Sequence, residues 1–398
     1  PERKRIYSEI IVLSAVILLV AAAVFAQRWI ARLILVKEIE KDIISWRRHL
    51  HQNPEVGFEL PNTIDFVCKK LDEFGIEYDR NAAKSAVIGY IHGAEKGDVI
   101  ALRADMDALP VCEATGLEFA SKNSFMHACG HDAHTSILLG AAKVLNDLKE
   151  NFKGTVKLIF QPAEELGTGS VDICEKGILD DVKEILGLHV GCISDEVKSG
   201  EFLFSKGSMM ACMDKFSIKV KGVGAHGAYP SLSVDPVVIG SHIVVAIQEI
   251  LGREVHPTEP AVITVGQFHS GSAFNIIPPE AYLEGTVRAV TNETRELIAK
   301  RIEEVASNIA KAFRGSIEYQ FFRQPPPLIN DAKVTDKAMG AAKELFPNDV
   351  KLMQRPVMGG EDFAWYLEKV PGSFIFLATP SPIEGKVWPH HNPKFALD

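Results

Sequence analysis

The 398-residue chain lacks the features that mark several classes of protein. It has only six cysteines and no Cys-x-x-Cys pair, which argues against a disulfide scaffold and favours unpaired thiols in a reducing setting. The body of the chain has no basic cluster and no interleaving of basic with aromatic residues, and the formal net charge is −9. No nucleic-acid partner is therefore expected. Internal repeats and low-complexity tracts are also missing.

Long hydrophobic runs are rare, and the one that stands out lies near the N-terminus. Residues 10–26 are almost entirely apolar and have basic residues on both sides. A membrane-spanning helix needs about 20 such residues. We interpret residues 1–36 as a hydrophobic anchor or signal segment, and favour an uncleaved signal-anchor helix over a cleaved signal peptide or a buried core helix. The protein is expected to be membrane-anchored or exported, and cytoplasmic otherwise.

From Lys37 onward the pattern is that of a globular α/β protein. Four short apolar runs suit strands that are buried on both faces. They are residues 99–102, 155–160, 185–188 and 374–378. Helical stretches lie between several of them; in one, apolar residues recur at helical spacing at Ile137, Ala141, Leu145 and Leu148. The sequence predicts a mainly parallel sheet in a catalytic domain made of residues 37–212 and 325–398.

The middle of the chain, residues 213–324, has a different order of elements. Phe216, Ile218 and Val220 alternate with polar residues, as on a half-buried strand. The predicted elements that follow are a helix at 236–251, strands at 261–268 and 281–290, a helix at 294–313 and a strand at 316–322. This β-α-β-β-α-β order is that of a ferredoxin-like unit. We predict an α+β satellite domain inserted into the catalytic domain.

Polar groups gather where the predicted strands of the catalytic domain end. Asp105 and Asp107 follow the first strand, Glu164 and Glu165 the second, His189 the third, and His391 comes after the last. A single histidine beside a strand is more often a packing residue, but four such strand ends are hard to explain by chance. In open α/β sheets, ligands bind at the carboxyl ends of the strands. Together with the pair Cys129 and His131, these residues predict a metallohydrolase site.

At this point the chain resembles a known family. Residues 103–110, 127–134, 161–165, 187–190 and 391–395 match, in the same order, motifs of the M20 peptidase family, in its amidohydrolase branch. That branch contains N-acyl-amino-acid, hippurate and auxin–amino-acid conjugate hydrolases. The resemblance covers residues 37–398. Family members usually continue into a closing helix, so the resemblance predicts that residues 325–398 lack the end of the catalytic domain.

The resemblance implies a site for two divalent metal ions, Mn²⁺ or Zn²⁺. The implied ligands are Cys129, His131, Glu165, His189 and His391, with Cys129 as the bridge. Thiolate, imidazole and carboxylate suit these metals, and a paired site can hold both the attacking and the leaving oxygen. The alternative for Cys129 is a small buried apolar side chain, which is the usual state of a free cysteine.

The resemblance also implies roles for residues around the metals. Glu164 would be the general base and acid that moves a proton from the attacking water to the leaving nitrogen. Asp107 would orient a ligand imidazole. Asp105 stands where related branches carry a metal-binding histidine, and structural hydrogen bonding is its default role. His127 and His134, which flank the ligands, are expected to support them.

The satellite domain carries three further candidates. The resemblance implies that His226 reaches the active site of a partner subunit and stabilises the oxyanion. Asn275 is similar to a substrate-contact position, although a turn-forming asparagine is an almost equal alternative. Arg288 would bind a substrate carboxylate or pair within its sheet. A homodimer formed through the satellite domain is therefore expected.

The predicted function is hydrolysis of the amide bond of small N-acyl amino acids, which gives a carboxylic acid and a free amino acid. A dipeptidase and an N-acetyl-diaminopimelate deacetylase are alternatives within the enzyme class, because motifs do not reveal the shape of the acyl pocket. A membrane-anchored binding protein without catalysis is an alternative of another class. It would be expected to lack ligands, whereas all five ligands and Glu164 are present.

Overall fold

The computed structural model describes residues 36–191 and 198–397, so the predicted anchor at residues 10–26 lies outside the described residues. By their contacts, these residues form two compact units. The first unit contains the described residues up to Gly207, then Asn330–Gln354 and the residues from Trp365 onward. The second unit contains Ser208–Ile329 and Arg355–Ala364. Each unit is described separately below.

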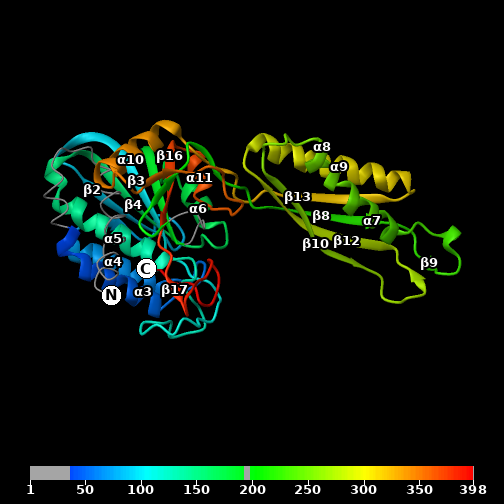
Figure 1. The fold of residues 1–398 in the computed structure, drawn as a ribbon, viewed down its shortest axis with the longest axis horizontal. Helices are drawn as coiled ribbons and strands as arrows, with labels where there is room; N and C mark the ends of the chain where they lie inside the picture. Colours follow the sequence, from blue (N-terminus) through cyan, green and yellow to red (C-terminus); the bar gives the residue numbers. More distant parts are fainter. Residues whose placement is uncertain (1–35, 192–197, 398) are drawn as a thin grey trace. The chain divides into compact units, whose positions relative to one another are not determined.

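The first unit is built on an eight-stranded sheet (Figure 1). In spatial order its strands are β1 (Glu77–Asp79), β2 (Val87–His92), β4 (Lys153–Gln161), β3 (Glu95–Asp105), β5 (Val182–Gly191), β16 (Gly372–Ala378), β6 (Phe202–Phe204) and β15 (Val350–Leu352). The central strands β4, β3, β5 and β16 run parallel to one another, whereas β1, β2 and β4 pair antiparallel, as do β16 and β6. The predicted α/β class with a mainly parallel sheet is confirmed.

Helices on one face of this sheet share a single apolar core with it. They are α3 (Glu40–Gln52), α4 (Pro61–Phe74), α5 (His131–Asp147) and α10 (Ala332–Leu345). Alternate residues of β5, Leu186, Leu188 and Val190, belong to this core. Because side chains alternate across a strand, His189 projects to the other side. The shorter α6 (Gly169–Glu175), η1 (Lys149–Asn151) and α11 (Ala364–Leu367), and the small strands β17 (Pro382–Ile383) and β18 (Lys386–Val387), complete the connections. The small strand β14 (Leu328–Asn330) lies where the chain passes from the second unit back to the first.

The four apolar runs of the sequence lie within β3, β4, β5 and β16, and all four strands are longer than the runs. β5 continues to Gly191, so His189 lies inside the strand rather than after it. β3 likewise extends to Asp105, which is buried. Polar side chains end the apolar run in the sequence, but here they continue the hydrogen-bonded ladder. Pattern alone therefore placed the strand ends too early.

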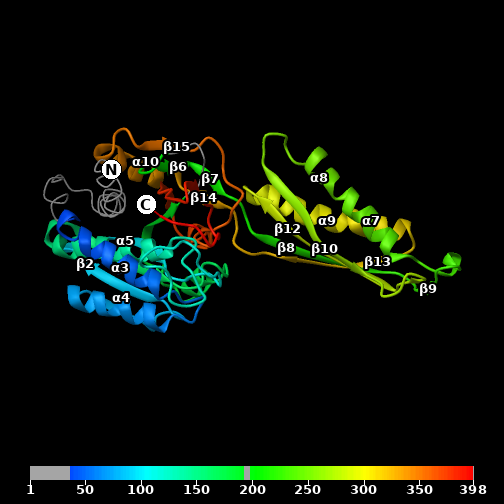
Figure 2. The same cartoon turned by 60° about the horizontal axis from the view of Figure 1, so that its bottom comes forward.

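The second unit contains a four-stranded antiparallel sheet with helices on one face (Figure 2). The sheet order is β10 (Ala261–Ser270), β12 (Glu280–Ala289), β8 (Asp214–Lys221) and β13 (Ser316–Phe322). α7 (Pro236–Ala246), α8 (Gln248–Arg253) and α9 (Asn292–Ala312) pack on it through one apolar core. The short strand β7 (Gly207–Met210) precedes β8 in the chain, and β9 (Ala225–His226), η2 (Pro230–Leu232) and β11 (Ile276–Ile277) lie between the larger elements.

Local sequence explains where these helices begin. The Asp235 side chain accepts hydrogen bonds from the amides of Val237 and Val238, and Pro236 takes the first helical position of α7. The single helix predicted at 236–251 is divided into α7 and α8 at Ile247. Residues Pro236–Arg253 are long and apolar enough to cross a membrane by length and composition alone. However, Ile239, Ile243 and Ile250 are buried in the core of this unit.

A buried cluster of charges joins α3 to the beginning of α5. His51 Nδ1 lies 2.9 Å from Asp132 Oδ2, and His51 Nε2 lies 3.3 Å from a Glu113 oxygen. Arg47 donates to the same Asp132 oxygen over 3.1 Å. Ionised carboxylates only accept hydrogen bonds, so both ring nitrogens of His51 carry protons. Burial lowers the pKa of His51, but attraction and hydrogen bonding to Asp132 and Glu113 outweigh it and raise the pKa to about 9.

This geometry predicts that His51 stabilises the fold in a pH-dependent way. Since the folded pKa is raised from 6.5 to about 9, the stabilisation is complete below pH 6.5 and is lost as the pH rises through about 9. Since one pKa unit corresponds to about 1.36 kcal/mol, protonated His51 contributes up to about 3 kcal/mol to the free energy of unfolding. Urea unfolding of wild type and His51→Gln below and above this range measures it. The two proteins should converge at high pH, and the exposed His92→Gln is the matched control. A difference that does not change with pH would contradict the assignment.

Candidate metal centre

The turn that begins α5 brings Cys129 and His131 to one place. Gly130 between them has φ +93°, in the left-handed region. A Cβ atom at this position would lie 2.9 Å from a Val190 methyl group and 3.1 Å from Leu397. Only glycine meets both the backbone conformation and the close packing. The motif therefore requires glycine at this position for steric reasons.

Main-chain carbonyls determine which ring nitrogen of two histidines is free to bind a metal. His131 Nδ1 donates to the carbonyl of Asp107 over 2.8 Å, and His189 Nδ1 donates to the carbonyl of Val190 over 2.8 Å. Each proton on Nδ1 leaves a lone pair on Nε2. The Nε2 atom of His189 lies 3.3 Å from Cys129 Sγ. His131 Nε2 is buried and has no hydrogen-bond partner among the described residues.

Two groups of potential ligands share Cys129. The first group is Cys129, His131 and His189; the second is Cys129, Glu165 and His391. Within each group, the potential ligand atoms lie within 4.8 Å of one another. The structure thus brings together all five predicted metal ligands, with Cys129 common to both groups.

The adjacent glutamates are held by Asp107. Its carboxylate accepts the amide of Glu164 over 3.1 Å and the amide of Glu165 over 3.2 Å. The residue before them, Ala163, is buried and has φ +54°. Such a conformation is unusual for a residue other than glycine and is typical of functional sites. Asp107 thus contacts His131 closely through its carbonyl, while its carboxylate fixes the loop that carries Glu164 and Glu165.

His391 also has a left-handed backbone, with φ +66°. Its amide donates to the carbonyl of Ala128 over 2.8 Å, which ties the C-terminal segment to the residue before Cys129. Its Nε2 atom lies 3.4 Å from Glu165 Oε2. The half-exposed imidazole of His391 therefore closes the group on the side that solvent reaches.

The charges of the site favour a cation. Burial lowers the pKa of His131, but Asp105, Asp107 and Glu165 outweigh it and raise the pKa to about 10. Burial raises the pKa of Glu165 to about 7; Asp107 acts in the same sense, and His131 opposes it. The raised pKa of His131 reflects the negative charge around this imidazole, whereas the raised pKa of Glu165 reflects mainly its burial. A divalent metal ion would neutralise this charge better than a proton on one histidine.

The remaining predicted site residues lie in the second unit. His226 is exposed, and its Nδ1 atom accepts the amide of Ala228 over 3.0 Å, which leaves the Nε2–H as a free donor direction. Asn275 lies beside it, since its carbonyl accepts the amide of Gly227 over 2.8 Å. Arg288 is the next-to-last residue of β12, and its Nη1 donates to Thr286 Oγ1 over 2.7 Å.

Several residues that support the site were not singled out from the sequence. They are Arg103, Gln161, Tyr366, His390, His51 and Asp132. The sequence does carry a signal for Arg103. It stands in an apolar strand two residues before Asp105, so the two side chains face the same side of the sheet and can form an ion pair. Tyr366 gave none, since it is distant in sequence and reaches Gln161 only through the fold.

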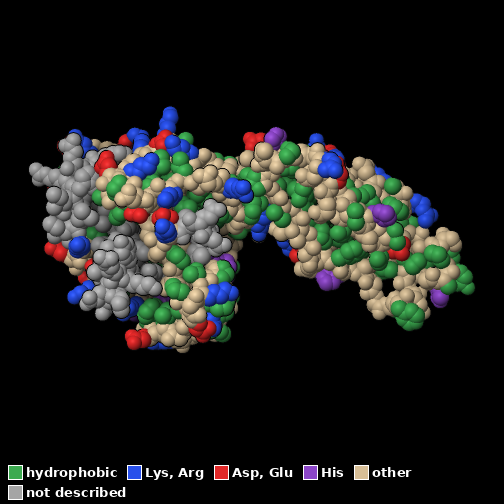
Figure 3. Space-filling model, viewed as in Figure 1, with side chains coloured by type: hydrophobic (Ala, Val, Ile, Leu, Met, Phe, Trp, Pro, Cys, Tyr) green, Lys and Arg blue, Asp and Glu red, His purple; other side chains and the backbone are tan. Residues whose placement is uncertain are grey.

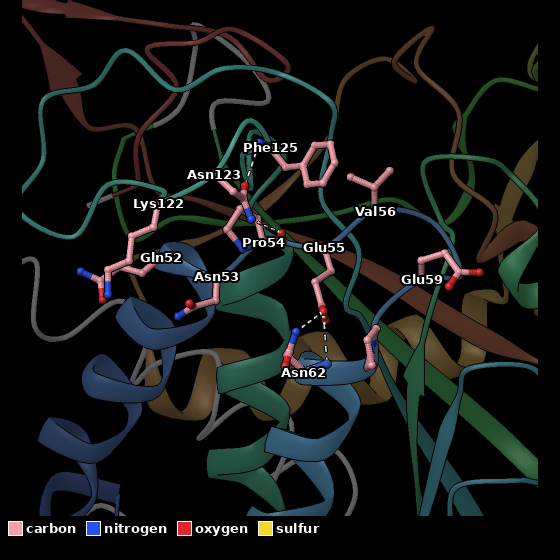
Figure 4. A pocket seen from close by; sticks show the side chains of 11 residues that line it. Gln52, Asn53, Pro54, Glu55, Val56, Glu59, Asn62, Lys122, Asn123 and Phe125 are labelled. Atoms are coloured by element: carbon pink, nitrogen blue, oxygen red, sulfur yellow. Dashed lines mark hydrogen bonds between the residues drawn. The ribbon is translucent and has the colours of Figure 1, made fainter.

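The hollow in Figure 4 is a separate feature of the first unit. Its volume is about 700 Å³, and its lining includes Gln52, Glu55, Val56, Lys122 and Phe125. None of the predicted site residues lines it. A main-chain hydrogen bond links its lining to the site: the carbonyl of Glu55 accepts the amide of Ala108, next to Asp107, over 2.7 Å. The potential metal ligands gather instead around Cys129.

Several known proteins resemble this chain over most of its length. The profile of peptidase family M20/M25/M40 matches residues 101–398. N-acetyl-L-cysteine deacetylase of Bacillus subtilis is 41% identical over 361 residues, which cover 90% of this chain and 84% of that protein. Thermostable carboxypeptidase 2 of Saccharolobus solfataricus is 39% identical over 91% of this chain and 92% of that protein.

A solved structure supports both fold and family. The YXEP protein of Bacillus subtilis, described as a dinuclear metal binding peptidase from the M20 family, is 35% identical with a TM-score of 0.80. The match covers 91% of this chain and 94% of that one. The prediction that this protein is a hydrolase is confirmed by these relatives. The chain belongs to peptidase family M20/M25/M40.

Proposed function

We propose that this protein is a dinuclear metal-dependent amidohydrolase that cleaves the amide bond of small N-acyl amino acids. The observation that carries the proposal is the pair of ligand groups that share Cys129. The deacetylase at 41% identity acts, by its name, on an N-acetylated amino acid, which supports the substrate class.

The chemistry of the donor set fits two divalent ions. His131 Nε2 and Glu165 Oε1 are buried without hydrogen-bond partners among the described residues, and such atoms are costly unless they bind something. Cys129, His131 and His189 would hold one ion, and Cys129, Glu165 and His391 the other. Thiolate, imidazole and carboxylate ligands suit Zn²⁺ or Mn²⁺. When bound, such ions polarise a carbonyl group and make water a better nucleophile.

Glu164 is the residue we assign to proton transfer. It is buried, and its Oε2 lies 3.8 Å from His131 Nε2, so the carboxylate faces the ligand cluster. In the proposed reaction it takes a proton from the attacking water and delivers it to the leaving nitrogen. Asp107 holds the amides of both glutamates, which keeps the proton-transfer carboxylate and the ligand carboxylate in fixed positions. His226 Nε2–H is the proposed donor to the oxyanion.

Peptide hydrolysis is the second candidate. The carboxypeptidase at 39% identity favours it by name, and both reactions break an amide bond next to an amino-acid carboxylate. Arg288 is the candidate that we propose for binding this carboxylate, and Asn275 is the candidate for contacting the amide.

The first test is a substrate panel. Metal-free protein, reloaded with Mn²⁺ or Zn²⁺, is offered N-acetyl and longer N-acyl amino acids and dipeptides, and release of the free amine is measured. We expect turnover of N-acyl amino acids only after metal is restored. Turnover of dipeptides alone would favour the peptidase. Tight binding of N-acyl amino acids without turnover in metal-loaded protein would favour a binding protein.

The two adjacent glutamates should give opposite phenotypes. Glu164→Gln should keep its metal but lose about 10²–10⁴-fold in kcat, because an amide cannot carry the proton. Glu165→Gln should lose metal, since it removes an anionic ligand. Elemental analysis and kcat measurement distinguish the two. Glu175→Gln, an exposed glutamate on α6, is the matched control and should change neither quantity. Exchanged phenotypes would reverse the assignment.

We also propose that the second unit is a satellite domain that forms a homodimer. Hydrophobic side chains gather on the visible surface of this unit (Figure 3), and Val237, Val238 and Val245 of α7 are exposed. α7 is apolar on almost every side, so its outer face would be covered by another apolar surface. A second copy of the same helix would supply one.

Complementation tests whether His226 acts across this dimer. His226→Ala and Glu164→Gln homodimers should each be nearly inactive. A mixed dimer would contain one site with both defects and one with none, so co-expression should restore up to about half of the activity per heterodimer. In the control, the variant His256→Ala, which changes an exposed histidine of the same unit, is used in place of His226→Ala. No recovery in heterodimers isolated by two tags would exclude action in trans.

Membrane attachment through residues 10–26 remains a proposal that rests on the sequence pattern alone. If it is correct, the full-length protein stays with the membrane during carbonate extraction. Release of a soluble form that begins near Gln27 would favour a cleaved signal peptide instead.

A further inference from the structure

We propose that Asp105 and His134 are positioning residues that fix His189 and His131 for metal binding, and that neither is itself a ligand. The inference rests on the function proposed above, because it concerns the same metal centre. It gives Asp105 a role that the sequence left open, and it gives a reason for the second histidine of the first turn of α5.

Both carboxylate oxygens of Asp105 are already engaged. Oδ2 accepts Arg103 Nη1 over 2.7 Å, and Oδ1 lies 2.5 Å from His134 Nδ1. All three side chains are buried, so the guanidinium neutralises the carboxylate out of reach of solvent. Arg103 is fixed in turn, because its Nε donates to Gln161 Oε1 over 2.8 Å, and Tyr366 donates to the same oxygen. Asp105 is thus held in place by β4 and by Tyr366.

A main-chain donor determines which ring nitrogen of His134 carries the proton. The amide of Val190 donates to His134 Nε2 over 2.8 Å, so this nitrogen carries the lone pair. The proton is therefore on Nδ1, from which it is donated to Asp105. His134 has no lone pair left for a metal. Although Asp105, His131 and His134 are close enough together to resemble a metal site, the carboxylate of Asp105 and both ring nitrogens of His134 are satisfied by hydrogen bonds without a metal.

The chain of hydrogen bonds ends at the peptide groups around His189. Val190 donates its amide to His134, while its carbonyl accepts His189 Nδ1 over 2.8 Å and His390 Nε2 over 3.2 Å. A shift of Val190 would therefore turn the His189 ring and its Nε2 lone pair. Asp105 Oδ2 also lies 3.6 Å from His131 Nε2, so it contributes negative charge to the second imidazole. One buried network thus acts on two of the three ligands of one group.

Two substitutions of His134 separate its hydrogen bond to Asp105 from its hydrogen bond to the Val190 amide. His134→Gln keeps an acceptor near the Val190 amide and weakens the bond to Asp105. His134→Asn keeps a donor near Asp105 and leaves the Val190 amide unpaired. Ser136→Ala is the control, because it removes another buried hydrogen bond of the same turn, from Ser136 Oγ to the Asp132 carbonyl, without touching the network. Urea unfolding of the metal-free proteins measures the general cost of each change.

Metal affinity, measured by competition with a chelator, and the visible spectrum of Co²⁺-loaded protein report on ligand geometry independently of turnover. We expect His134→Asn to lose about 10–100-fold in affinity, as for other residues that orient metal-bound histidines. His134→Gln should lose less, and only these two variants should alter the Co²⁺ spectrum. At saturating metal, kcat should fall with KM unchanged.

Three results would overturn the proposal. Unchanged affinity and spectrum in both His134 variants would show that the network has only a structural role. An equal loss in Ser136→Ala would assign the effect to helix stability. Loss of one bound ion per chain in a His134 variant, with the remaining ions bound as in wild type, would make His134 a ligand. Failure of the wild type to bind metal would instead contradict the proposed function, so the two failures are distinguishable.

Discussion

The structure of the site follows from one electrostatic constraint, an excess of buried negative charge around His131. Asp105, Asp107, Glu164 and Glu165 all lie near this imidazole, and the buried Arg103 lies beside Asp105. Buried carboxylates need partners, since an unpaired charge in the low-dielectric interior of a protein costs free energy. The raised pKa values of His131 and Glu165 are the response of the protein without metal. The proposed ions satisfy the same need and at the same time supply the chemistry.

The sheet explains how ligands distant in sequence reach this point. β3, β4 and β5 run parallel, so their carboxyl ends meet at one edge. Asp105, Glu164 and His189 each come from one of these strands or the loop after it. Short apolar runs in the sequence located these strands, and the polar residues after each run predicted the cluster. These parts could be predicted because a strand buried on both faces needs a continuous run of apolar residues.

What the sequence could not provide is the identity of the hydrogen-bond partners. The resemblance predicts that Asp107 orients an imidazole but not which of its atoms does so: its carbonyl makes the short contact with His131, and its carboxylate holds two amides. Main-chain groups carry no sequence signal, since every residue has them. The links from Tyr366 to Gln161 and from His51 to Asp132 also join distant segments, and only the fold brings them together. The division of the second unit's first helix at Ile247 likewise has no turn residue to mark it.

The main-chain arrangement also explains how neighbouring residues can have different tasks. Ala163 and His391 have left-handed backbones, which turn the chain sharply next to the residues that face the cluster. Because consecutive amides of Glu164 and Glu165 are both bound by Asp107, the two side chains leave the loop from fixed points. Both carboxylates then reach His131, but the Glu165 carboxylate also lies 3.4 Å from His391, although a single peptide bond separates the two glutamates. A loop held only by its side chains would let the two carboxylates exchange positions, whereas a loop held through its amides does not.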